Sequence, residues 1–95
     1  MKIELCTQDR HGTNSEIVSD NICYIKYTEE FYVTVLVRDY SYEKWAKFEK
    51  TSAFHSENGG MLEAGPGVMS YDLIFERLED AEDFVVDVKR RNGNF

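Results

Sequence analysis

Residues 31–38 read Phe-Tyr-Val-Thr-Val-Leu-Val-Arg, and this run of β-branched and aromatic residues decides how the chain folds. Such residues are enriched in strands, where successive side chains point to opposite faces of the sheet. One face, which we assign to the core, carries Phe31, Val33, Val35 and Val37. The other face carries Tyr32, Thr34, Leu36 and Arg38. Because this second face is also partly apolar, we expect another element or a second copy of the chain to cover part of it.

Three further segments predict strands around this one. Lys2–Thr7 alternates apolar and polar residues in the manner of a half-buried strand. A second strand is predicted to start within Ile17–Asn21 and to continue through Tyr27, and Thr28-Glu29-Glu30 then joins it to residues 31–38 as a hairpin. The last strand is Val68–Phe75, whose core side carries Met69, Tyr71, Leu73 and Phe75.

Two segments have the apolar spacing of amphipathic helices. Ser41 is a suitable N-cap for a helix from Tyr42 to about Ser52 that turns Trp45 and Phe48 inward. A second helix is predicted from about Leu78 to Arg91. Its apolar stripe, spaced i, i+3, i+4 and i+7, consists of Ala81, Phe84, Val85 and Val88.

The predicted order of elements is β-β-β-α-β-α in a single domain that spans residues 1–95. This order is typical of an α+β fold with a four-stranded, mostly antiparallel sheet and two helices on one face. A right-handed crossover through the first helix would instead place the third and fourth strands parallel, and both topologies stay open. Between the helix and the last strand, His55–Gly67 is read as two turns that bracket Met61-Leu62-Glu63, and we expect it to be the most mobile stretch.

Composition limits the classes of partner. The chain has 18 acidic residues against 11 Lys and Arg, a net charge of −7, which disfavours direct binding to nucleic acid or to anionic membranes. Residues 51–95 hold nine of the acids and only four of the bases. No apolar run reaches the length of a signal peptide or a membrane span, so we expect a soluble, cytoplasmic protein.

The residues that could perform catalysis or bind metal form no recognisable motif. Cys6 and Cys23 are expected to be free, mostly buried thiols, with a disulfide between neighbouring strands as the alternative. His11 lies in a polar loop and His55 just past a helix, and neither has the paired spacing of a zinc site. We therefore expect no enzymatic activity, no metal and no cofactor.

The most distinctive feature is a set of six acids between Glu76 and Asp87, in and just before the second helix, on the outer faces of a segment whose apolar residues face inward: Glu76, Glu79, Asp80, Glu82, Asp83 and Asp87. These acids either only solvate the outer face of the helix or bind a cationic groove of a partner. In the second interpretation Glu79, Asp83 and Asp87 form a row. Its members are about 6 Å apart along the helix axis, close to the spacing of successive phosphates in a nucleic-acid strand.

In size, charge and acidic helix, the chain resembles a class of phage-encoded inhibitors that imitate the charge of DNA. The resemblance implies an anti-restriction type of function, in which the acids occupy the nucleic-acid groove of a basic host defence or restriction enzyme. Two other functions stay open. A regulatory interaction domain would use its sheet face, with Tyr24, Tyr32 and Leu36, to bind a protein strand or to form a homodimer. An RNA-binding module would stack bases on sheet aromatics, although the net charge disfavours this.

Overall fold

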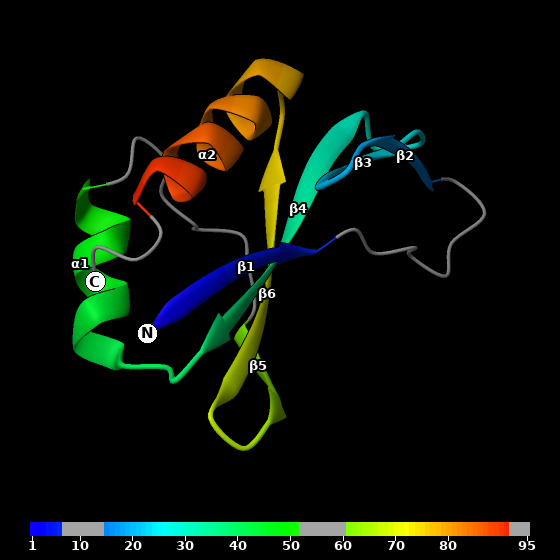
Figure 1. Ribbon diagram of the computed structural model, residues 1–95. Helices are drawn as coiled ribbons and strands as arrows, with labels where there is room; N and C mark the ends of the chain where they lie inside the picture. The colour runs from blue at the N-terminus through cyan, green and yellow to red at the C-terminus, as the bar shows by residue number, and fades with distance from the viewer. Residues whose placement is uncertain (7–14, 52–60, 92–95) are drawn as a thin grey trace.

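The structure is a computed structural model that describes residues 1–6, 15–51 and 61–91 (Figure 1). Within these ranges the chain forms six strands and two helices. In chain order they are β1 (Lys2–Cys6), β2 (Ser15–Ser19), β3 (Ile22–Ile25), β4 (Glu30–Arg38), α1 (Tyr42–Thr51), β5 (Met61–Gly65), β6 (Val68–Phe75) and α2 (Leu78–Arg91).

The strands form one sheet in the order β2-β3-β4-β6-β5, and every pairing among the described residues is antiparallel. Strand β1 also pairs with β4, along residues 34–38, whereas β3 pairs with β4 along residues 30–32. Strand β6 occupies the other edge of β4 over residues 31–38. Therefore β1 and β3 follow one another along a single edge of β4.

Both helices pack on the same face of the sheet, where Figure 1 shows them side by side. That face receives alternate residues of β4 and β6, including Val33, Val35 and Leu73. The helices contribute Trp45, Phe48, Ala81, Phe84 and Val88 to the same core. The core is rich in aromatic rings: Phe84, for example, lies 6.1 Å from Phe48 and 5.6 Å from Phe75 between ring centroids.

The predicted α+β class, the single helix-bearing face and the boundaries of both helices are confirmed. Ser41 caps α1 as expected, because its hydroxyl accepts a hydrogen bond from the Lys44 amide and its carbonyl accepts one from the Trp45 amide. The topology left open by the sequence is also decided. The third and fourth predicted strands, β4 and β6, are adjacent and antiparallel, not parallel.

The prediction of four strands was wrong in two places. The predicted second strand is two strands, β2 and β3, joined by a turn at Asp20 and Asn21. Asp and Asn are common turn residues, because their side chains bond to nearby backbone groups. The second error concerns Met61-Leu62-Glu63, which belongs to β5 and not to a loop between two turns. Residues 55–60 of the stretch expected to be most mobile lie outside the described residues.

Strand β5 forms because Pro66 and Gly67 make a tight hairpin turn between β5 and β6. Gly67 has a φ of 73°, a conformation that side-chain-bearing residues rarely adopt. A proline followed by a residue with positive φ is typical of a type II turn. This turn brings Met61 opposite Tyr71 and Glu63 opposite Met69.

The sheet face turned away from the helices is also protected from solvent around β3 and β4. Tyr32 is only 1% exposed, and Cys23 and Thr34 are buried as well. The Thr34 hydroxyl donates a hydrogen bond of 2.7 Å to Asp72 Oδ1 on the neighbouring strand. Because this burial occurs within one chain, a second copy is not needed to cover this part of the face.

Replacing Phe84 with Ala is expected to lower the free energy of unfolding by about 3–5 kcal/mol, because it removes a buried ring from between two others. Urea denaturation followed by circular dichroism measures the loss. The matched control is Val86→Ala on the same helix, where the side chain is 64% exposed and the expected loss is below about 0.5 kcal/mol. A loss below about 1 kcal/mol for Phe84→Ala would show that a different face of α2 is buried.

Candidate functional site

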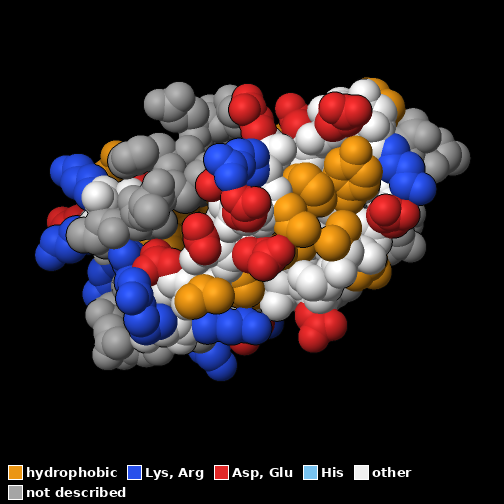
Figure 2. All heavy atoms as spheres, turned by 90° about the horizontal axis from the view of Figure 1, so that it is seen from above, with side chains coloured by type: hydrophobic (Ala, Val, Ile, Leu, Met, Phe, Trp, Pro, Cys, Tyr) orange, Lys and Arg blue, Asp and Glu red, His pale blue; other side chains and the backbone are white. Residues whose placement is uncertain are grey.

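Helix α2 presents acidic side chains to solvent because its other side is fixed in the core. Ala81, Phe84 and Val88 are buried, as the apolar spacing predicts. Exposed acids precede Ala81, at Glu79 and Asp80, and follow it, at Glu82 and Asp83, and Glu76 is exposed just before the helix. Figure 2 looks down on this end of the molecule and shows a cluster of acidic side chains.

The acids of the predicted binding surface differ in whether they have a partner within the chain. Glu79 forms an ion pair with Arg77, the residue that precedes the helix. Among the described residues, no cation forms an ion pair with the other four exposed acids, which are Glu76, Asp80, Glu82 and Asp83. We call these four residues the acidic cluster. It covers the N-terminal half of α2 and the approach to it.

Asp87 differs from the acidic cluster because its carboxylate is mostly buried and has cationic partners within the chain. Its side chain is only 16% exposed, and Arg90 Nη2 lies 2.9 Å from Asp87 Oδ1. The second oxygen, Oδ2, is buried and accepts no hydrogen bond from the described residues, and Arg91 Nη1 lies 3.7 Å from it. Asp87 is therefore held in contacts within the chain, and the predicted row of Glu79, Asp83 and Asp87 has one uncompensated member, Asp83.

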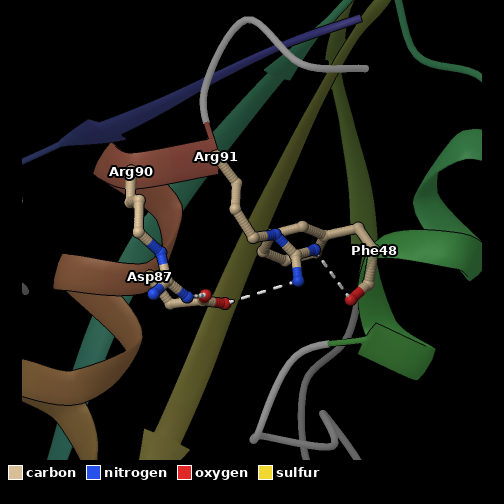
Figure 3. A network of polar contacts seen from close by, with 4 residues as sticks. All are labelled: Phe48, Asp87, Arg90 and Arg91. Carbon is tan, nitrogen blue, oxygen red and sulfur yellow. Dashed lines mark hydrogen bonds and ion pairs between the residues drawn. The ribbon is translucent and has the colours of Figure 1, made fainter.

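Arg91 connects this carboxylate to α1, as Figure 3 shows. Its guanidinium carbon lies 4.3 Å from the centre of the Phe48 ring, a cation–π geometry, and Nη2 donates a hydrogen bond of 3.2 Å to the Phe48 carbonyl. Phe48 is in the last turn of α1, at the negative end of the helix dipole, where a cation is stabilising. The contacts between Asp87, Arg91 and Phe48 therefore fasten the C-terminal ends of the two helices together.

An apolar patch on the helix-bearing face was not identified from the sequence. Tyr24 of β3 and Phe31 of β4 pair across the strands, and their rings stack with centroids 4.8 Å apart. Both are only partly buried, as are Leu78 and Val85 of α2. We call these four residues the apolar patch. In Figure 2 hydrophobic side chains gather beside the acidic ones. The signal in the sequence is the large number of aromatics, six Tyr, six Phe and one Trp, but the register that pairs Tyr24 with Phe31 is what places two of them here.

The three residues predicted as sheet-face contacts do not form one surface. Tyr24 lies on the helix-bearing face, because it pairs with Phe31, whereas Tyr32 and Leu36 point to the opposite face. Tyr32 is buried, so its ring cannot stack on a base or touch a second copy in this conformation. Leu36 is half-buried. Self-association and RNA binding stay predictions that a single chain does not test.

The residues considered for catalysis are not brought into a catalytic arrangement in the described part of the chain. Both cysteines are free, with Cys23 buried and Cys6 partly buried, as expected. Burial and the nearby Glu4 raise the pKa of the Cys6 thiol, with Arg38 opposing them, so the thiol is a poor nucleophile at neutral pH. His11 and His55 lie outside the described residues.

Two further searches of residues 1–6, 15–51 and 61–91 gave negative results. Their His, Cys, Asp and Glu side chains form no group that could hold a metal ion. Neither of the two described helices is long and apolar enough to cross a membrane. The candidate site is the exposed surface made by the acidic cluster and the apolar patch.

Replacing Arg91 with Ala is expected to lower the free energy of unfolding by about 1–3 kcal/mol, because Asp87 loses its buried cation and Phe48 loses its cation–π partner. Thermal and urea denaturation measure the loss. The matched control is Arg90→Ala, which removes an exposed guanidinium from the same carboxylate and should cost below about 0.5 kcal/mol. Equal losses for the two variants would mean that Arg91 does not fasten α2 to α1.

Comparisons of the chain with known proteins found no relative. No protein-family model matches the chain, and searches of curated proteins and of solved structures give no match either.

Proposed function

We propose that this chain is a small, non-enzymatic binding protein that acts by occupying the basic surface of a nucleic-acid-binding partner. The contact surface is the N-terminal half of α2, with the acidic cluster at its centre. One observation carries the proposal: four exposed carboxylates, at Glu76, Asp80, Glu82 and Asp83, have no compensating cation among the described residues. By contrast, Asp87 of the same helix is compensated by Arg90 and Arg91.

The neighbouring apolar patch supports a protein as the partner. Tyr24 and Phe31 offer rigid, partly exposed rings, and aromatic residues dominate the binding energy of many protein interfaces. Charges around such a patch increase the rate of association and select the partner by sign. A surface with acids beside aromatics therefore suits a protein whose basic groove has an apolar rim.

Imitation of DNA is the more specific form of this proposal. Residues four apart on a helix lie about 6 Å apart along its axis, which matches successive phosphates on one strand. Glu79 and Asp83 have this separation, with Glu79 also paired with Arg77, and the uncompensated Asp80 and Glu82 lie beside them. Because Asp87 is engaged within the chain, the imitation covers a short stretch of a strand. A host restriction or defence enzyme is the class of partner that would be inhibited in this way.

Charge reversal of Glu82 and Asp83 to Lys tests the proposal. The variant should fold, since both side chains are exposed and the lysine introduced at position 83 would face Glu79 one turn away. As bait in nuclease-treated lysate, the parent protein should enrich a basic partner, and the variant should enrich it at least about tenfold less. The control, Glu43→Lys, reverses the charge of an exposed acid on α1, outside the acidic cluster and the apolar patch, and should retain the partner.

Competition with duplex DNA then separates imitation of DNA from other binding. If the surface occupies a nucleic-acid groove, added duplex DNA should release the captured partner, and raising the salt concentration should weaken the complex steeply. Retention of the partner by the Glu82 and Asp83 variant, at the parent's level, would rule out α2 as the contact surface. Retention of the partner in excess duplex DNA would rule out imitation of DNA but would leave α2 as the contact surface.

A further inference from the structure

Strand β2 is an open edge of the sheet. It ends the strand order, and its only neighbour among the described residues is β3. Its apolar side chains are not covered by the rest of the chain: Ile17 is 53% exposed and Val18 is 42% exposed. Natural edge strands usually avoid exposed β-branched residues, because their free backbone groups can pair with another strand. This edge therefore has the properties of a strand-binding site.

The pairing register shows what an added strand would meet. Directly opposite residues of paired strands point to the same face, so Ile17, Cys23, Tyr32 and Ile74 form one row across four strands. Cys23 and Tyr32 are buried, and Ile17 is the exposed end of this apolar row. The adjacent row, on the helix-bearing face, runs from Phe31 through Tyr24 and ends at the edge in Glu16. The edge thus offers one acidic position, Glu16, and one apolar position, Ile17, on opposite faces, ahead of a register shift between Ile17 and Ser19.

The charges around this edge select the kind of strand. Residues 15–30 carry four acids, Glu16, Asp20, Glu29 and Glu30, against one base, Lys26. Lys26 is already within 3.1 Å of Glu16. A second copy of the chain would bring the same excess of negative charge to the interface, and like charges destabilise association. A strand with basic residues would be attracted.

We propose that β2 binds an extended, basic segment of another protein as an added strand. The bound segment alternates apolar residues, which extend the row that ends at Ile17, with Lys or Arg residues, which face Glu16. Backbone hydrogen bonds supply the binding energy common to all such segments, and the alternation supplies the selectivity. This site is separate from the acidic cluster of α2 and does not depend on the function proposed for it.

The test uses peptides of defined sequence and the isotope-labelled full chain. The probe is the capped peptide Val-Lys-Val-Lys-Val-Lys-Val, and its binding is followed through the backbone amide resonances of residues 15–19. Three control peptides are matched to it. The first has Glu in place of Lys, the second has the same composition with all Val before all Lys, and the third carries N-methyl groups on alternate residues. We expect the probe to bind and shift these resonances, and each control to bind at least about tenfold more weakly.

Two variants locate the site. Ile17→Lys adds a like charge at the edge and should weaken binding of the probe at least about tenfold. Tyr27→Lys removes an exposed aromatic, 77% exposed in the β3–β4 turn, and adds the same charge without touching the edge, so the probe should bind within about threefold of the parent. The variant with Glu82→Lys and Asp83→Lys should bind the probe as the parent does. This result would show that the peptide does not bind at the acidic cluster of α2.

Any of five outcomes would overturn the proposal. The probe could leave residues 15–19 unshifted, or it could bind Ile17→Lys as tightly as the parent. The N-methylated peptide could bind equally well, which would mean that charge alone is recognised. Sedimentation could show a dimer of the parent that becomes a monomer in Ile17→Lys, which would assign this edge to a second copy. If charge reversal at positions 82 and 83 abolishes probe binding, the peptide occupies the acidic cluster instead.

Discussion

The antiparallel pairing of β4 with β6 is the interaction on which the rest of this structure depends. It runs from Phe31 opposite Phe75 to Arg38 opposite Val68, and it fixes which residues of both strands share a face. Val33 and Leu73 are thereby placed side by side on one face, where both helices cover them. Strands β1 and β3 then occupy the remaining edge of β4. The face chosen by this pairing also sets how α2 is turned and which of its side chains reach solvent.

Helix α2 is divided into two halves with different physical roles. Its C-terminal half is bound to α1 through Asp87, Arg91 and the Phe48 ring, so the charges there are largely compensated. Its N-terminal half carries exposed acids beside partly exposed aromatic and aliphatic side chains. The C-terminal half stabilises the packing of the helix. This packing holds the N-terminal half in a fixed orientation toward a partner. A rigidly held surface loses less conformational entropy on binding than a flexible one.

Much of this arrangement follows from local sequence patterns. The spacing of Ala81, Phe84 and Val88 identified the buried side of α2, and Ser41 marked the start of α1. What the sequence did not reveal depends on contacts between distant residues. Arg91, which lies near Asp87 within α2, is held by Phe48 of another helix, and the apolar patch requires the register that stacks Tyr24 on Phe31. Strand β5 was missed because its residues have no alternating pattern of their own and form a strand by pairing with β6.

The central claim is that the N-terminal half of α2 and the adjacent apolar patch are the surface that meets the partner. Cross-saturation NMR of the labelled chain in complex with the captured partner tests this most directly, because it reports contact residue by residue. The account predicts strong transfer to Asp80, Glu82 and Asp83, with weaker transfer to Tyr24 and Phe31. Transfer confined to Leu36 and its neighbours on the opposite face of the sheet, with none on α2, would contradict it.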